Sequence, residues 1–361
     1  MAFLDAFAGK RVLVTGHTGF KGSWLSEWLI ALGADVHGIA LPPPTKPSLF
    51  EELHLATRMN HHVGDIRDPR LVLSLISTIE PDFVFHLAAQ PLVRLSYQQP
   101  IETLTTNIMG TAHVLEALRQ AQHRCTVVAV TTDKCYHNQE WVHSYRETDP
   151  LGGYDPYSAS KGAAEIVIAS YRNSFFSAPE SSVRLASARA GNVIGGGDWA
   201  LDRIFPDCVR ALESGSTIAV RNKTATRPWQ HVLEPLSGYL WLAACLDRES
   251  PNGTLASAFN FGPSLDSNRT VAALVVEILK HWDGRWEDLS DPHAVHEANR
   301  LNLATDKAFH QLGWRPVWSF EETIERTVHW YKNCLSAQTV TSNQITSYQS
   351  RAADMAIPWA Q

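Results

Sequence analysis

The chain has 361 residues, of which 44% are hydrophobic and 19% are charged, and its net charge is -6. This length can bury a substantial core in one large domain or two smaller ones. The slightly acidic balance excludes the basic face or tail typical of nucleic-acid-binding proteins, and no apolar run approaches the roughly 18 residues of a membrane span, so we expect neither partner.

Short apolar runs alternate with longer amphipathic stretches over the first third of the chain. In chain order they predict strands at 11–15, 34–41, 82–88 and 125–132, and helices at 20–33 and near 101–122. Strand, helix and strand in this order predict parallel strands joined by crossover helices. Continuous apolar strands also predict a sheet that is covered on both faces. We therefore expect a doubly wound α/β fold of the Rossmann type.

The lengths and types of the predicted elements change after about residue 190. The stretch "GNVIGGGDW" (191–199) is rich in glycine, and the elements that follow are shorter and more mixed. We expect a Rossmann domain in residues 1–190 and a smaller mixed α/β lobe in 191–335, with some chain crossing back. This lobe should lie over the strand ends, where open α/β sheets bind ligands. Residues 336–361 are polar and aperiodic, which predicts a loosely held tail.

Three glycines follow the first predicted strand in "VLVTGHTGFKG", namely Gly16, Gly19 and Gly22. Glycine has no Cβ, so the backbone can turn tightly and approach a pyrophosphate, whose charge the amides at a helix N-terminus would meet. Glycine-rich turns are common and can be purely structural. Here the turn lies between a predicted strand and a predicted helix, which favours a dinucleotide site.

Charged residues around this turn leave the type of dinucleotide open. His17 and Lys21 either add positive charge near the phosphates or point into water. About 20 residues after the glycines, where an acidic residue would hold the ribose of NAD, residues 39–41 read Ile-Ala-Leu. Lys46 is nearby, so NADP stays possible. Asp65, in "GDIRD", is a candidate partner for the adenine amino group.

A tyrosine and a lysine four residues apart, Tyr157 and Lys161, occur in "YDPYSASKGAAE". If a helix begins at Asp155 or Pro156, both side chains lie on one face. A lysine beside a tyrosine stabilises the phenolate and lowers the tyrosine pKa, which makes a base for a sugar or alcohol hydroxyl. Taken alone, the same spacing also fits a solvated helix face.

Further motifs accompany this pair, in the order expected for one fold. They are the glycine turn, "DI" (65–66), "HLAAQ" (86–90), "TTDKCY" (131–136), "YSASK" (157–161), "RAGNVIGGGDW" (189–199), "RPWQHV" (227–232) and "LGWRP" (312–316). The set resembles the extended short-chain dehydrogenase/reductase family from about residue 9 to about residue 333. Within that family, "TTDKCY", "GGYDPYSASKGAAE" and "LPPPTKPSLFEE" look most like the nucleotide-sugar 4,6-dehydratases. The resemblance implies NAD, a homodimer, and a nucleotide sugar, CDP-glucose, held between the lobes.

Carried over by position, the resemblance implies two sets of binding residues and no metal. The cofactor set is Gly16, His17, Gly19, Phe20, Lys21, Gly22, Asp65, Ile66, Leu87, Ala88, Ala89, Thr106, Tyr157 and Lys161. The substrate set is Gln90, Asn192, Arg203, Arg227 and Arg300. Arginine forks suit phosphate oxygens, but each of these arginines could equally form a surface or interlobe ion pair.

The resemblance also implies catalytic roles for the residues after the fourth predicted strand. Related dehydratases have Thr-Asp-Glu there, so Thr132 would polarise the sugar hydroxyl and Asp133 would protonate the leaving 6-hydroxyl. Lys134 stands where glutamate would remove the C5 proton. Because lysine is a base only when neutral, Lys134 is either that base or a charged group that stabilises the enolate.

The implied reaction converts CDP-glucose to its 4-keto-6-deoxy form, with hydride moving from C4 to NAD and back to C6, for deoxysugars of lipopolysaccharide O-antigen. An epimerase or net oxidoreductase of the same fold stays possible, although it needs no acid and base beyond Tyr157 and Lys161. A dinucleotide-sensing binding protein would be expected to lack one of those two residues. The implied dimer pairs the Tyr157 helix and the helix near 101–122 with their copies.

The five cysteines are scattered, with no CxxC pair and no cysteine–histidine cluster at metal-ligand spacing. They are Cys125, Cys135, Cys208, Cys245 and Cys334. A disulfide framework and a structural zinc site are therefore not expected. The N-terminal stretch also lacks a basic start followed by a long apolar core. We expect a soluble cytoplasmic protein.

Overall fold

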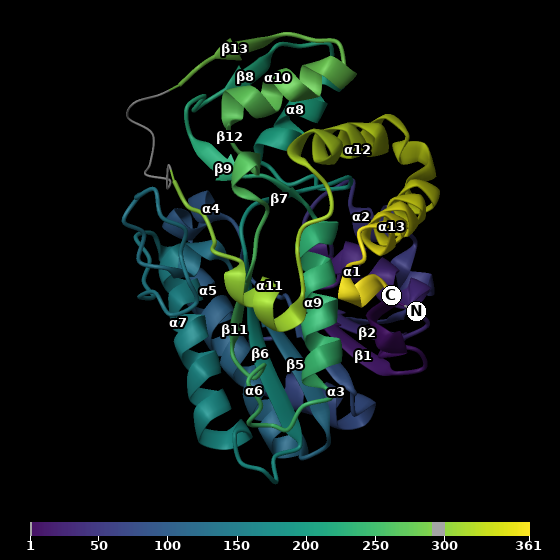
Figure 1. The fold of residues 1–361 in the computed structure, drawn as a ribbon, viewed down its shortest axis with the longest axis vertical. Helices are drawn as coiled ribbons and strands as arrows, with labels where there is room; N and C mark the ends of the chain where they lie inside the picture. The colour runs from purple at the N-terminus through teal and green to yellow at the C-terminus, as the bar shows by residue number, and fades with distance from the viewer. Residues whose placement is uncertain (1, 291–299) are drawn as a thin grey trace.

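A parallel sheet of seven strands forms the centre of the protein in the computed structural model, which describes residues 2–290 and 300–361 (Figure 1). The strand order is β11-β6-β5-β4-β1-β2-β3. The strands are β1 (Arg11–Thr15), β2 (Asp35–Ala40), β3 (Asn60–Val63), β4 (Phe83–His86), β5 (Cys125–Val130), β6 (Val183–Ala190) and β11 (Ala258–Phe261). The predicted doubly wound α/β fold is confirmed.

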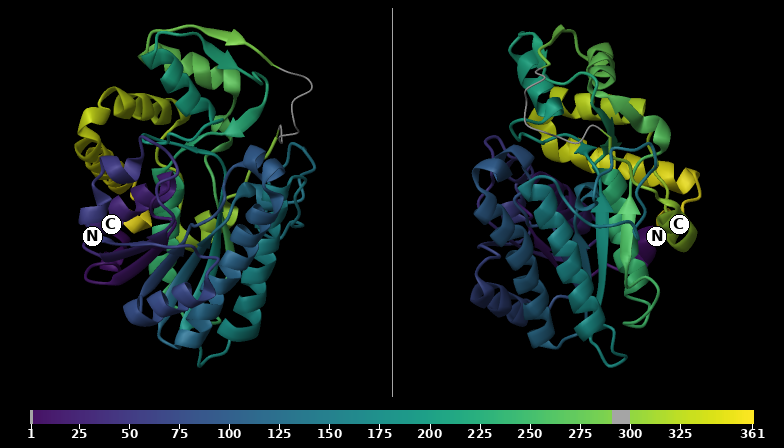
Figure 2. Two further views of the ribbon diagram at one scale, coloured as in Figure 1. Left: turned by 180° about the vertical axis from the view of Figure 1, so that it is seen from behind. Right: turned by 90° about the vertical axis from the view of Figure 1, so that its left-hand side faces the viewer.

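Helices cover both faces of the sheet (Figure 2). On one face lie α3 (Pro69–Ile79), α6 (Gly110–Ala121) and α7 (Pro156–Tyr171), and on the other lie α1 (Phe20–Ala31) and α9 (Leu233–Leu246). Consecutive strand residues alternate between two apolar cores. Val12 and Val14 pack into the core under α1 and α9, whereas Leu13 packs into the core under α3 and α6. Burial on both faces explains why the strands are continuous apolar runs.

The predicted helices are present, with one local change. The helix near 101–122 is a continuous path of three segments, namely α5 (Pro100–Leu104), a π-helical turn (Thr105–Met109) and α6. The helix α7 begins at Pro156 as expected, because the Asp155 side chain accepts a hydrogen bond from the Ser158 amide and caps it. Of the helices in the described ranges, none is both long and apolar enough to cross a bilayer.

Two stretches of the chain after residue 190 form a smaller lobe at the top of Figure 1. Its elements are α8 (Ile204–Glu213), β8 (Ile218–Val220), β9 (Thr226–Pro228), β12 (Asn268–Thr270), α10 (Val271–His281) and β13 (Trp286–Asp288). Strand β9 pairs antiparallel with β12, and β8 pairs parallel with β13. The chain also crosses back, because α9 packs on the main sheet and β11 extends it beside β6. A division at residue 190 stays a prediction.

The remaining elements connect or cover these layers. They are α2 (Leu49–Glu52), α4 (Val93–Gln98), β7 (Val193–Ile194), β10 (Gln230–His231), α11 (Asp306–Leu312), α12 (Phe320–Lys332) and α13 (Ala337–Asp354). Strands β7 and β10 pair in parallel. Strand β7 follows β6 and leads the chain into the smaller lobe, and β10 leads it back to α9.

The prediction of a loosely held tail in 336–361 is wrong. Helix α13 packs against α1 and α12, and the two termini lie close together (Figure 1). Trp359 is fully buried and stacks on Phe3, with ring centroids 4.9 Å apart. The buried face of α13 recurs at helical spacing, but it includes polar residues such as Thr341, Gln344 and Tyr348. A search for apolar periodicity therefore misses it.

Glu234, at the start of α9, anchors this C-terminal segment. Its carboxylate accepts hydrogen bonds from the backbone amides of Val317 and Trp318, at 2.9 and 2.8 Å. The Tyr348 hydroxyl on α13 donates a third bond, at 2.6 Å. Burial raises the pKa of Glu234 to about 7, although these hydrogen bonds oppose the shift. The folded protein thus holds a proton that an exposed glutamate would release.

Replacing Glu234 by glutamine should flatten the pH dependence of stability. Between the ordinary glutamate pKa of 4.5 and about 7, the folded state binds a proton that the unfolded state has lost, so this group lowers the free energy of unfolding as pH rises. The difference between wild type and Glu234→Gln should therefore fall by up to about 3 kcal/mol across this window. Urea denaturation at several pH values measures it. The control is Glu321→Gln, an exposed site on α12, and a constant difference for Glu234→Gln would contradict the prediction.

Candidate functional site

The glycine turn lies where the strand order reverses, between β1 and β4. Gly16 has φ +79, and a Cβ there would lie 2.8 Å from the Ala88 backbone in the loop after β4. A Cβ on Gly22 would lie 2.2 Å from the Gly16 carbonyl oxygen. At Gly19 the nearest atom to a Cβ would be 3.4 Å away, which is ordinary contact. Close packing thus requires glycine at two of the three positions, beside the crevice where open α/β sheets bind ligands.

The N-terminus of α1 fits a phosphate-bearing cofactor. Gly19 is its N-cap in an extended conformation, and no side chain caps the helix. The first amides of a helix have no partner within it, and the helix dipole favours negative charge there. The loop after β4, which carries Leu87, Ala88 and Ala89, lies beside this turn, and the Ala88 amide is held by the Thr15 hydroxyl at 3.1 Å.

His17 lies inside the protein, so both predictions for it are wrong. It is fully buried, and its Nε2 lies 2.6 Å from Nδ1 of His61 on β3. Burial and His61 lower the pKa of His17 to about 3, so the ring adds no positive charge at neutral pH. Gly38 on β2 makes room for it, since a Cβ there would lie 2.3 Å from the ring. The surroundings of His17 thus come from β2 and β3, which lie far from it in the sequence.

Lys21 points inward and not into water. Its Nζ lies 3.5 Å from the Tyr239 hydroxyl on α9. Burial and, to a smaller extent, the charge of Arg203 lower the pKa of Lys21 to about 7, against the effect of Asp133. Lys21 therefore joins the electrostatics of the candidate catalytic groups.

Asp65, the predicted partner of the adenine amino group, is hydrogen-bonded to its neighbour Arg67. Both carboxylate oxygens of Asp65 accept hydrogen bonds from Arg67, at 2.6 to 2.8 Å, which lowers the pKa of Asp65. Ile66 is buried against Gly110 on α6. Lys46 is exposed on the loop after β2.

Asp133 and Lys134 form an ion pair directly after β5. Thr132 caps the short 3-10 turn Asp133–Cys135 and donates its hydroxyl to Oδ1 of Asp133 at 2.9 Å. Nζ of Lys134 donates to the same oxygen at 3.1 Å and to Oδ1 of Asn192 at 3.1 Å. Asp133 is 1% exposed, and its Oδ2 has no hydrogen-bond partner among the described residues. A Cβ on Gly191 would lie 2.9 Å from that oxygen.

Tyr157 and Lys161 meet this pair from α7, and both are buried. The Tyr157 hydroxyl hydrogen-bonds with the Thr132 side chain. The predicted lowering of the Tyr157 pKa by Lys161 is wrong for the protein alone, because burial raises the pKa of Tyr157 above its ordinary value. Burial also lowers the pKa of Lys161 to about 8, and its Nζ lies 3.4 Å from the Val130 carbonyl.

Two residues that position these groups are missed by the motifs. Gly162 follows Lys161, and a Cβ there would lie 2.7 Å from the Gly152 carbonyl oxygen and 3.2 Å from that of Cys135. Helix α7 can therefore press against the catalytic turn. In the sequence, the glycine directly after Lys161 was the signal that could have predicted this close packing.

Asn107, in the π-helical turn beside Thr106, is the second. Its Oδ1 accepts from the Gln90 amide at 2.8 Å, and its Nδ2 donates to the Ser160 hydroxyl at 2.8 Å. It ties the loop after β4 to α7. No motif around Asn107 in the sequence predicts this role.

The predicted substrate residues lie in different surroundings. The Gln90 side chain braces its own loop, with Nε2 donating to the Thr103 hydroxyl and Oε1 accepting from the Leu92 amide. Asn192 contacts Lys134, as described above. Arg203 begins α8, donates to Asp198 at 2.8 Å and lowers the pKa of Tyr157.

The other two arginines belong to outer segments. Arg227 lies on β9, where it donates to the Thr226 carbonyl at 2.9 Å. Arg300 is exposed, and its carbonyl accepts a hydrogen bond from Asn138 at 3.2 Å. Phe20, at the start of α1, packs near Gly195.

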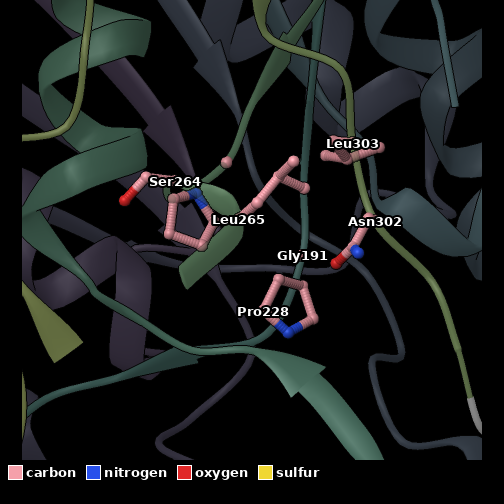
Figure 3. A pocket seen from close by; sticks show the side chains of 8 residues that line it. Gly191, Pro228, Ser264, Leu265, Asn302 and Leu303 are labelled. Carbon is pink, nitrogen blue, oxygen red and sulfur yellow. The ribbon is translucent and has the colours of Figure 1, made fainter. Parts of the chain in front are cut away.

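A cavity lies between the segments that follow β6 and β11 and the smaller lobe (Figure 3). Its lining residues are Gly191, Pro228, Gly262, Pro263, Ser264, Leu265, Asn302 and Leu303. Gly191 is both part of this wall and the neighbour of the unpartnered Asp133 oxygen. Within 2–290 and 300–361, no group of three or more histidine, cysteine or acidic side chains is arranged to hold a metal ion.

Comparisons with known proteins agree on one family. The family model described as GDP-mannose 4,6 dehydratase matches residues 13–327. CDP-glucose 4,6-dehydratase from Salmonella typhimurium is 50% identical over 350 residues, which cover 95% of this chain and 97% of that protein. The dTDP-glucose 4,6-dehydratase DesIV from Streptomyces venezuelae, solved with NAD bound, is 26% identical with a TM-score of 0.73, covering 90% of this chain and 97% of that one. UDP-glucose 4-epimerase from Thermotoga maritima shares the fold, with 21% identity, a TM-score of 0.75 and coverage of 90% and 99%.

Alanine at Gly22 should destabilise the protein more than alanine at Gly19. The new Cβ of Gly22→Ala would lie 2.2 Å from a backbone oxygen, whereas that of Gly19→Ala would make an ordinary contact. We expect Gly22→Ala to lower the free energy of unfolding by about 2 kcal/mol or more, and Gly19→Ala by less than about 1 kcal/mol. Urea denaturation without added ligand measures both. Equal losses would show that the turn tolerates a side chain at either position.

Proposed function

Because the chain belongs to the GDP-mannose 4,6 dehydratase family, we propose that it removes water from CDP-glucose to give CDP-4-keto-6-deoxy-D-glucose. The observation that carries this proposal is the pair Asp133 and Lys134, held by Thr132 beside Tyr157. An epimerase has no use for this second acid and base. The relative with 50% identity is named for CDP-glucose, which supports cytosine as the base of the substrate.

NAD is the cofactor of this proposal, as in the solved dTDP-glucose 4,6-dehydratase. The uncapped N-terminus of α1 and the glycine at position 16 suit its pyrophosphate, and the loop of Leu87 to Ala89 lies beside them. When bound, NAD accepts a hydride from C4 of the sugar and returns it to C6. The reaction therefore has no net redox change.

Tyr157 is the proposed base for the 4-hydroxyl. Its pKa is raised by burial, whereas its hydrogen bond with the Thr132 side chain and the charge of Arg203 act in the opposite direction. In the proposed step the Thr132 hydroxyl turns its proton from Asp133 to Tyr157, and with Arg203 it stabilises the phenolate that must form.

Asp133 and Lys134 then carry the dehydration. A ketone at C4 makes the C5 proton acidic, and the Lys134 amine is the group proposed to take it or to stabilise the enolate. In this scheme a proton first passes from the Lys134 ammonium to Asp133, because the ion pair itself holds neither a base nor an acid. As the C5–H and C6–O bonds then break, a C5=C6 double bond forms, Lys134 takes the C5 proton, and Asp133 supplies the proton that lets the 6-hydroxyl leave as water. Oδ1 of Asp133 is engaged by Thr132 and Lys134, so the unpartnered Oδ2 is the atom assigned to this proton.

We further propose a homodimer formed through α5 and α7. These helices contact each other and expose large apolar side chains to solvent. Ile101 on α5 is 73% exposed, and Ile166 on α7 is 60% exposed. Covering both in a second copy would remove this apolar surface from water.

The cytoplasm is the proposed compartment. All five cysteines are free, and three of them are buried. Unpaired thiols suit a reducing compartment.

Incubation with NAD and CDP-, UDP-, dTDP- or GDP-glucose should give a product only with CDP-glucose, and its mass should be lower by one water. Deuterium placed at C4 of the glucose should reappear at C6, because the same hydride returns to the sugar. Mass spectrometry and NMR of the product measure both. A product of unchanged mass would identify an epimerase and overturn the proposal.

The matched test of the acid in the same assay is Asp133→Asn. Asparagine keeps an oxygen that can accept from Thr132 and Lys134 but supplies no acid, so dehydration should fall by about 100-fold or more. Asp68→Asn is the control, because asparagine caps α3 as well as aspartate does. Full turnover by Asp133→Asn would remove Asp133 from its assigned role.

Aspartate at both Ile101 and Ile166 should separate the proposed dimer into monomers, because two charges would be buried in the interface. Sedimentation velocity measures the change. The control is Val276→Asp, at an exposed site on α10 in the smaller lobe. A wild-type monomer, or a double variant that stays dimeric, would contradict the proposed surface.

A further inference from the structure

A buried ion pair that takes no direct part in the proposed reaction lies beneath the catalytic turn. Glu165 on α7 and Arg189 on β6 are 2.8 Å apart, and their side chains are 2% and 4% exposed. Burying two charges is unfavourable unless further hydrogen bonds satisfy them. Glu165 gains two such bonds, from the Ser187 hydroxyl at 2.9 Å and from the Thr131 hydroxyl.

The two terminal guanidinium nitrogens of Arg189 are hydrogen-bonded, whereas its buried Nε has no hydrogen-bond partner among the described residues. One guanidinium nitrogen donates to the Tyr136 hydroxyl at 2.8 Å and to the Glu147 carbonyl at 3.1 Å. The guanidinium also lies 5.0 Å from the centre of the Tyr136 ring. The Tyr136 hydroxyl in turn donates to Oδ1 of Asn260 on β11, at 2.7 Å.

The two links from the pair, Thr131 and Tyr136, are the residues on either side of the segment 132–135. That segment contains Thr132, Asp133 and Lys134. The ion pair therefore fastens both ends of the catalytic segment to α7 and β6. Glu165 lies on α7, four residues after Lys161. The same pair therefore also connects the segment to the helix that carries Tyr157 and Lys161.

We propose that the Glu165–Arg189 pair is the positioning element for the dehydration half of the reaction, and that it acts through Thr131 and Tyr136 on Asp133 and Lys134. This inference rests on the proposed function. The pair touches no reacting atom in this scheme. A displacement of about 1 Å in a catalytic group can cost about 100-fold in rate, so a small release of the segment would be measurable.

The links are better targets than the pair itself. Glu165 also raises the pKa of Lys161 against the effect of burial, so replacing Glu165 would alter oxidation at C4 as well as dehydration. Thr131→Val and Tyr136→Phe each remove one hydroxyl and leave both charges in place. Ser187→Ala is the matched control, because it removes a hydroxyl bonded to the same carboxylate but lies on β6, away from the catalytic segment.

The experiment mixes each folded variant rapidly with CDP-glucose and NAD, and follows the absorbance of reduced nicotinamide together with the formation of product. Thr131→Val and Tyr136→Phe should form product about 10-fold more slowly or worse, while reduced nicotinamide accumulates because oxidation at C4 continues. Ser187→Ala should show no such accumulation. Thermal unfolding of all three variants shows whether their losses of stability are comparable.

Two results would overturn the inference. One is turnover by Thr131→Val and Tyr136→Phe that matches Ser187→Ala, and the other is an equal loss of oxidation and dehydration, which indicates a structural role only. If Tyr136→Phe does not fold, Thr131→Val decides alone. Wild-type protein that forms no 4-keto-6-deoxy product from any nucleotide-linked glucose would instead overturn the proposed function.

Discussion

The burial of one carboxylate, that of Asp133, is the constraint on which the rest of the site depends. An ionised carboxylate removed from water is costly unless hydrogen bonds and opposite charges compensate it. Thr132 and Lys134 supply the hydrogen bonds. The charge in turn raises the pKa values of Lys21 and Tyr157, from α1 and α7. The pKa values of groups on α1 and α7 thus depend on a single side chain in the turn after β5.

Parallel topology explains why these groups meet. The carboxyl ends of β1, β4, β5 and β6 lie at one edge of the sheet, so the glycine turn, the loop after β4, the catalytic segment and Asn192 converge without long connections. The smaller lobe is joined firmly to this edge, because one apolar core runs from β1 through α9 to Trp359. Helix α13 adds polar links, through Ser342 to Glu27 on α1 and through Tyr348 to Glu234 on α9. This core contains residues from both sides of position 190.

The sequence predicts those features that depend on local pattern. The apolar runs predicted β1, β2, β4 and β5, and Asp155 with Pro156 marks the start of α7, so the centre of the sheet and the spacing of Tyr157 and Lys161 could be predicted. Strand β3, which reads Asn-His-His-Val, and β6, which contains two arginines, lack such a continuous apolar run. Features that depend on distant neighbours could not be predicted. The pKa of His17 is lowered first by burial and then by His61, far along the chain. The polar face of α13 likewise finds its partners only in the folded protein. The predicted lowering of the Tyr157 pKa by Lys161 failed because burial, which residue spacing does not reveal, raises that pKa.

Two layers of charge follow from this arrangement. The deeper layer, Glu165 with Arg189, is neutral and faces the core, and the outer layer, Asp133 with Lys134, is neutral and faces the cavity side. Lys21 and Lys161 are left as additional buried amines, whose pKa values burial lowers to about 7 and about 8. A diphosphate or dinucleotide brought to this edge would raise both values, because negative charge favours the protonated amines. The local excess of positive charge is thus better matched to an anionic ligand than to a neutral one.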